Sequence, residues 1–102
     1  MQVVHGRLDA PLFVDSTLEV CGTAAGPLRV GPTGVLVLRG VCEGDVVLDV
    51  HARAEIWGIV RGNLINRGGE LCVFGIVEGY VQRTSGKTAV SADSIVRKGY
   101  RS

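Results

Sequence analysis

Histidine and cysteine are the residues of this chain that could bind a metal or act as a base or a nucleophile. The sequence holds two histidines and three cysteines, namely His5, His51, Cys21, Cys42 and Cys72. The cysteines lack the close pairing of a zinc site and of a disulfide framework, and the histidines fall at different places in the repeat described below. We therefore expect no metal site and interpret the cysteines as free thiols.

The stretch SGKT around Gly86 matches the last residues of a phosphate-binding loop. That motif also requires a glycine five residues before Gly86, and the chain has Val81 at that position. The nucleotide-binding interpretation therefore fails. Cys72 has no histidine beside it, and Cys21 shares with His5 only its position just before the first glycine of the repeat described below. We therefore expect no catalytic residues, no cofactor and no enzymatic activity.

Length and composition describe a small globular protein. The chain has 102 residues, of which 46% are hydrophobic and 21% are charged, so it can bury one core. The formal net charge of +1 gives no long-range attraction to nucleic acid or to an anionic membrane. The sequence contains neither the long apolar run of a membrane span nor the pattern of a signal peptide, so we expect a cytoplasmic location.

A short phrase built on two glycines recurs along the chain. The clear copies begin with the pairs Gly22 and Gly26, Gly40 and Gly44, Gly58 and Gly62, and Gly75 and Gly79. Their first glycines are 18, 18 and 17 residues apart. Gly6 lies sixteen residues before Gly22, and Ala92 lies seventeen residues after Gly75, so two degenerate copies extend the repeat to six. Degenerate terminal copies are typical of repeat proteins.

Apolar residues alternate within each copy, which is the period of a β-strand. The column two residues before the first glycine contains Val4, Val20, Leu38, Ile56, Val73 and Val90. The column two residues after it contains Leu8, Ala24, Cys42, Val60, Val77 and Ser94. The column six residues after it contains Leu12, Leu28, Val46, Leu64 and Val81. We expect all three columns to face inward.

These features predict an all-β fold. Short strands joined by turns of one to four residues leave no room for the crossover helices of an ordinary parallel sheet. The sequence therefore predicts a single domain over residues 1–102, a right-handed parallel β-helix, or β-solenoid, of about six coils of 16–18 residues with three short strands per coil. The degenerate terminal coils, residues 1–16 and 87–102, are expected to act as caps or as stacking ends.

The repeated phrase resembles the core repeat of a known family. Written as glycine, two hydrophobic residues, any residue, glycine, Asp or Asn, and a hydrophobic residue, it occurs here as GVCEGDV from Gly40 and GIVRGNL from Gly58. This pattern is similar to that of bactofilins, a polymer-forming family of the bacterial cytoskeleton. The resemblance covers about residues 4–96, and it implies a right-handed β-helix that polymerises end to end without a nucleotide.

Stacked coils turn each outward position into a row on the surface. The rows flanking the first glycine are apolar near the middle of the chain, and exposed apolar patches usually mark interfaces. The predicted lateral or partner interface consists of Val37, Val41, Trp57, Ile59, Cys72, Phe74 and Ile76. A separate row, three residues past the first glycine, contains Ala25, Glu43, Arg61 and Glu78. Its alternating charges are expected to support the register of the coils.

The two ends of a solenoid expose unpaired strand edges, which recruit other strands unless they are protected. The residues predicted to form a terminal stacking interface are Val4, Leu8, Leu12, Val90, Ile95 and Val96. Basic residues near the last coil could blunt its edge, or they could face Asp9 and Asp15 of another copy in head-to-tail stacking; these are Arg97, Lys98 and Arg101.

Two functions remain open from the sequence. The first is a non-enzymatic structural protein that self-assembles into a homo-oligomer or filament by end-to-end stacking, as bactofilins do. The alternative is a small binding module of the immunity or regulatory type, which engages one protein partner through the apolar face around Trp57 and Phe74.

Overall fold

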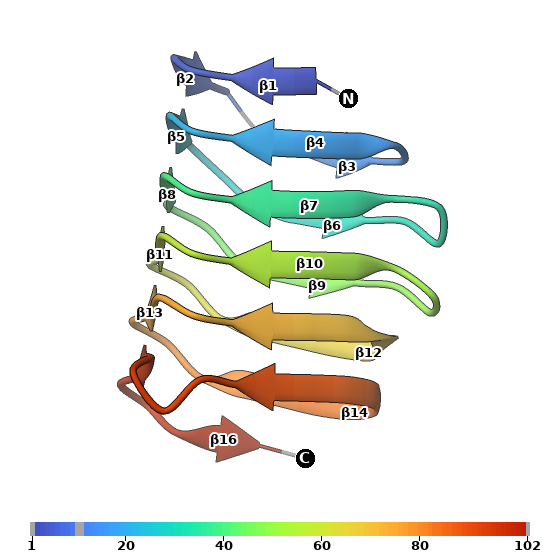
Figure 1. Cartoon of the computed structure of the whole chain (residues 1–102), viewed down its shortest axis with the longest axis vertical. Helices are drawn as coiled ribbons and strands as arrows, with labels where there is room; N and C mark the ends of the chain where they lie inside the picture. The colour runs from blue at the N-terminus through green and yellow to red at the C-terminus, as the bar shows by residue number, and fades with distance from the viewer. Residues whose placement is uncertain (1, 10–11, 102) are drawn as a thin grey trace.

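Every regular element in the described part of the chain is a β-strand, and the strands wind into a parallel β-solenoid of about five turns (Figure 1). The structure is a computed structural model that describes residues 2–9 and 12–101, without the side chains of Gln2 and Leu12. In Figure 1 the chain runs along the near strands, passes through the short strands and returns behind them, so it winds right-handed. The predicted all-β solenoid is confirmed, and its coil count roughly matches the six that were expected.

Each turn has three sides. The first side is formed by β1 (Gln2–Val4), β4 (Thr17–Val20), β7 (Val35–Leu38) and β10 (Arg53–Ile56). The second side is formed by six short strands, β2 (Arg7–Leu8), β5 (Thr23–Ala24), β8 (Val41–Cys42), β11 (Ile59–Val60), β13 (Ile76–Val77) and β15 (Ile95–Val96). The third side is formed by β3 (Leu12–Val14), β6 (Leu28–Val30), β9 (Val46–Leu48) and β16 (Tyr100–Arg101).

Two long strands, β12 (Leu64–Val73) and β14 (Val81–Val90), each bend from the third side onto the first. The lower coils therefore depart from the expected pattern of three short strands. In the coils above, the loops at residues 31–34 and 49–52 project from this corner (Figure 1). The lower coils turn the corner without leaving the strand because Gly68 and Gly86 adopt φ values of 153° and 83°, which side-chain-bearing residues rarely adopt.

The strand register aligns the three predicted inward columns almost completely. Val4, Val20, Leu38, Ile56, Val73 and Val90 are consecutive partners on the first side. Leu28, Val46, Leu64 and Val81 are consecutive partners on the third side, and Tyr100 follows Val81. The internal members of these columns are buried in one aliphatic core, so the alternation of the sequence translates directly into packing.

The last member of the second-side column was predicted wrongly. Ser94 was expected beneath Val77, but Val96 takes this place and Ile95 lies beside Ile76. The cause is a turn that adds two residues at the corner. The backbone N–H of Ser94 donates to the carbonyl of Ser91 at 3.0 Å, and its hydroxyl donates to the same oxygen at 2.6 Å.

The first glycine of each copy lies where successive coils approach most closely. A Cβ atom at Gly58 would overlap the carbonyl oxygen of Gly40 and lie 2.7 Å from the carbonyl oxygen of Arg39. Gly22, Gly40 and Gly75 meet the preceding glycine in the same way. The repeated glycine is therefore a steric requirement of coil stacking.

Candidate interaction surfaces

An aromatic pair stands at the corner between the first and second sides. The rings of Trp57 and Phe74 are stacked with their centroids 4.2 Å apart and their planes at 18°. They lie side by side because the backbone N–H of each residue bonds to the strand above, to Leu38 and to Ile56 respectively. The two residues remain 46% and 40% exposed, so the solenoid orders this pair without burying it.

The second side continues the apolar surface beside the aromatic pair. Val41, Ile59 and Ile76 are consecutive partners in its outward row, and all three are half-buried. Ile95 extends the row and is 47% exposed. The predicted row is thus present, and Ile95 adds one apolar member to it.

Val37 and Cys72, the other two members of the predicted interface, lie in a different row from these residues. Both lie on the outward face of the first side, and Glu55 is the register partner of each, so a carboxylate separates them. The Nε1–H of Trp57 donates to Oε1 of Glu55 at 3.1 Å. Glu55 therefore interrupts this row between Val37 and Cys72.

The charged row on the far edge of the second side follows the expected pattern only in part. Nε of Arg61 lies 3.8 Å from Oε2 of Glu78, as alternation predicts. Glu43 is instead paired with Arg7, whose NH2 lies 3.4 Å from Oε1 of Glu43. Each of these exposed pairs contributes on the order of 0.2 to 1 kcal/mol.

At the N-terminal end the apolar interior is open. Val4 and Leu8 are half-buried there, whereas their counterparts in the internal coils are buried completely. A shallow hollow of about 130 Å³ opens at this end, lined by Val4, Leu8, Phe13, Val14, Asp15, Ser16 and Leu18. The predicted stacking residue Leu12 contributes its backbone to β3, and its side chain lies outside the described part of the structure.

The C-terminal end is also open. Val90 and Val96 pack against the core but are only half-buried. A hollow of about 320 Å³ lies between the two arms of β14, lined by Val81, Arg83, Thr88, Val90, Tyr100 and Arg101. Tyr100 and Arg101 of β16 pair with Val81 and Gln82 alone. The described strands therefore leave the other arm of β14, at Lys87–Val90, unpaired on its lower edge.

Asn66 is a structural residue that the sequence reasoning missed. It is fully buried where β12 bends from the third side to the first. Its Nδ2 donates to the carbonyl of Gly69 at 3.1 Å, to that of Lys87 at 3.0 Å and to Oγ1 of Thr88 at 3.1 Å. Its Oδ1 accepts the N–H groups of Gly68 and Gly69 at 3.1 and 2.8 Å. These bonds join two successive coils at the corner.

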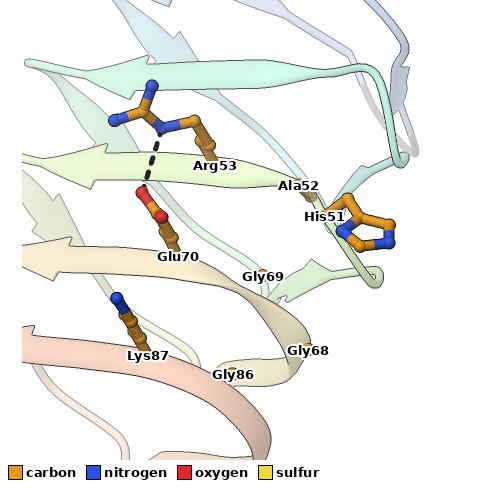
Figure 2. A pocket seen from close by; sticks show the side chains of 8 residues that line it. All are labelled: His51, Ala52, Arg53, Gly68, Gly69, Glu70, Gly86 and Lys87. Carbon is orange, nitrogen blue, oxygen red and sulfur yellow. Dashed lines mark ion pairs between the residues drawn. The ribbon is translucent and has the colours of Figure 1, made fainter.

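A polar hollow of about 410 Å³ lies on this same corner (Figure 2). On the first side Nε of Arg53 lies 3.3 Å from Oε2 of Glu70, and Lys87 is the next residue in the same column. His51 lies in the turn above with φ of 71°, and Figure 2 shows its ring directed away from the ion pair. Arg53 and Glu70 thus pair with each other, and the ring of His51 is held apart from them.

The cysteines differ in their surroundings. Desolvation raises the pKa of the half-buried Cys21 thiol, and so does the carboxylate of Glu19, which accepts its S–H at 3.4 Å. Burial also raises the pKa of the Cys42 thiol, which lies in the core. Cys72 is half-buried on the first side. A raised pKa lowers the thiolate fraction, so Cys21 and Cys42 are poor nucleophiles near neutral pH.

Within residues 2–9 and 12–101, no group of three or more His, Cys, Asp and Glu side chains is gathered in a way that could hold a metal ion. The same residues include no helix long and apolar enough to cross a membrane. No protein-family model matches the chain, and no match is found among curated proteins or solved structures.

Proposed function

We propose that this protein is a self-assembling structural protein, a bactofilin-like rod that stacks through its terminal coils. The observation that carries the proposal is the state of the two ends. The inward apolar columns continue to both ends, where Val4, Leu8, Val90 and Val96 are half-buried rather than covered by another described segment. Burying these side chains against a second copy would add to the hydrophobic stabilisation of the core.

The strand edges support the same proposal. β1, β2 and β3 each pair with one neighbour below, and β15 pairs with one neighbour above. Such edges carry N–H and C=O groups that another parallel strand can satisfy. A contact that adds one copy to the end of another does not close on itself, so it produces a filament.

The proposed role is non-enzymatic. The Arg53–Glu70 ion pair occupies the polar hollow, and the thiols of Cys21 and Cys42 have raised pKa values, which favours a structural role over a catalytic one. A bacterial cytoplasmic location belongs to the same proposal and rests on the resemblance to bactofilins.

Sedimentation over a range of concentrations, together with negative-stain electron microscopy, tests the proposal. The parent chain is expected to form filaments, and Val4→Lys and Val90→Lys are expected to remove them because each places a charge in a terminal apolar column. Ile65→Lys is the matched control, since Ile65 is a half-buried outward residue of an internal coil. Circular dichroism confirms that each variant is folded. A parent that stays a uniform small species at every concentration would refute self-assembly.

A second candidate function is supported by the exposed aromatic pair. Trp57 and Phe74, with the row of Val41, Ile59 and Ile76 beside them, offer a preordered apolar surface of the kind that binds a protein partner. In this case Trp57→Ala abolishes partner binding and leaves the oligomeric state unchanged. If Trp57→Ala instead disperses filaments, the surface is a lateral contact between rods.

A further inference from the structure

The last described strand and the first described strand lie on consecutive sides of the solenoid. The chain passes repeatedly from the first side to the second and then to the third. The first described strand, β1, lies on the first side, and the last, β16, lies on the third. The next strand of a continuing coil would therefore lie on the first side, beneath Lys87–Val90, where the lower edge of β14 is unpaired.

We propose that copies stack head to tail in one fixed register, so that the N-terminal coil of one copy continues the solenoid of another. β1 then pairs with the Lys87–Val90 arm of β14, β2 with β15, and β3 with β16. In this register Val4 follows Val90 and Leu8 follows Val96, which extends both apolar columns across the junction. The inference rests on the proposed self-assembly and adds its polarity and register.

The distribution of charge favours this polarity. The C-terminal end exposes five cationic side chains, Arg83, Lys87, Arg97, Lys98 and Arg101, and one carboxylate, Asp93. Tail-to-tail stacking would bring two such sets together, and like charges on neighbouring strands are destabilising. The N-terminal end exposes Asp9 and Asp15 together with one arginine, Arg7, whose Nε lies 3.6 Å from Oδ1 of Asp9. A head-to-tail junction therefore places carboxylates next to the cationic end.

One ion pair is specific to the proposed register. Arg97 continues the charged row, because its N–H bonds to Val77 as that of Glu78 bonds to Val60. Asp9 occupies the first place of the same row, and its side chain is 93% exposed. Across the junction Asp9 therefore follows Arg97, just as Glu78 follows Arg61 within the molecule.

Gly6 provides an independent observation. A Cβ at any of the four internal glycines would overlap the carbonyl of the glycine above, whereas a Cβ at Gly6 meets nothing within 4 Å. An isolated copy thus has no steric need for glycine here. In the proposed register the carbonyl of Ser94 from the neighbouring copy lies above Gly6, because Ser94 aligns with Gly75. The junction itself would then require the glycine.

Disulfide trapping tests the polarity. In a background of Cys21→Ser and Cys72→Ser, which retains the buried Cys42, the single substitutions Val3→Cys and Ala89→Cys are made on the outward face of the first side. Val3 and Ala89 occupy the two ends of one row, so the junction places their Cα atoms about 4.8 Å apart, within the range of a disulfide. The background without either new cysteine is the control.

Head-to-tail stacking predicts covalent dimers in an equimolar mixture of the two single-cysteine chains and none in either chain alone. Dimers of Val3→Cys alone, or of Ala89→Cys alone, would overturn the polarity while leaving self-assembly intact. If the background protein does not assemble at all by sedimentation, both the polarity and the proposed function are refuted.

Two further variants test the register. Gly6→Ala is expected to keep the melting temperature of the dilute parent and to lose assembly; normal assembly would overturn the register. Asp9→Arg or Arg97→Asp alone is expected to raise the concentration needed for assembly roughly 2- to 10-fold. Combining them in one chain is expected to recover part of this loss, because Asp9→Arg also removes the pair with Arg7 inside the molecule. A double variant no better than the single ones would contradict the ion pair.

Discussion

Replacing Asn66 tests whether one buried amide holds the corner between successive coils. Asn66→Ala removes three donated and two accepted hydrogen bonds. Because the amide has only two protons, two of its three donated bonds share a proton, and the net loss corresponds to about four bonds. At about 1 kcal/mol each, the free energy of unfolding should fall by about 4 kcal/mol. For a domain of this size that is a drop of roughly 15 to 30 °C in melting temperature.

Urea unfolding followed by the fluorescence of the single tryptophan measures this change, at concentrations below those at which the parent assembles. Asn63→Ala is the matched control, because the half-buried Asn63 accepts one N–H through its side chain, from Tyr80 at 2.9 Å. Its expected cost is about 1 kcal/mol. If Asn66→Ala costs no more than Asn63→Ala, the hydrogen bonds of Asn66 do not stabilise the corner.

Three more predictions follow from the stacking of the coils. Gly58→Ala should cost about 3 kcal/mol in denaturant unfolding because its Cβ meets the backbone of Gly40, while Gly6→Ala costs nothing; equal effects would contradict the steric argument. Burial raises the pKa of Cys42 above the ordinary 9.0, so the unfolded chain releases this proton first and the free energy of unfolding falls as pH rises above about 9. Cys42→Ala should lessen that fall, and an unchanged pH slope would refute the assignment. Trp57→Ala should leave the melting temperature within a few degrees of the parent because the ring is 46% exposed; a large loss would show that the aromatic pair is a folding element.

The sequence was sufficient to predict the fold and most of the register. Alternating aliphatic residues specify which face of a strand is buried, and a slip of one residue would turn every one of them outward. Together with glycines at sites of close coil contact, this pattern aligned the first-side column from Val4 to Val90 correctly. These predictions are correct because the alternation of apolar residues in a strand and the close backbone contact at a glycine are local features. Each copy of the repeat contains both.

Features set by turns could not be predicted in the same way. Ala92 occupies the expected place of a glycine, but hydrogen bonds between Ser94 and Ser91 close a longer turn and shift the last coil by two residues. Asn66 is an ordinary turn residue by type, and its burial depends on how β12 and β14 bend. The interruption of the outward first-side row by Glu55 was visible in the sequence, yet its hydrogen bond with Trp57 required the structure.

The sides on which the described strands begin and end also determine the geometry of a filament formed by head-to-tail stacking. The described strands begin on the first side and end on the third, so they make a whole number of passes over each side. In head-to-tail stacking, equivalent atoms of successive copies are then separated along the axis by about 29 Å, which is six strand spacings. The exposed loop at Pro32 and Thr33 would recur once per copy along one flank. A label placed there would mark each subunit once, and its spacing along the filament would count the subunits.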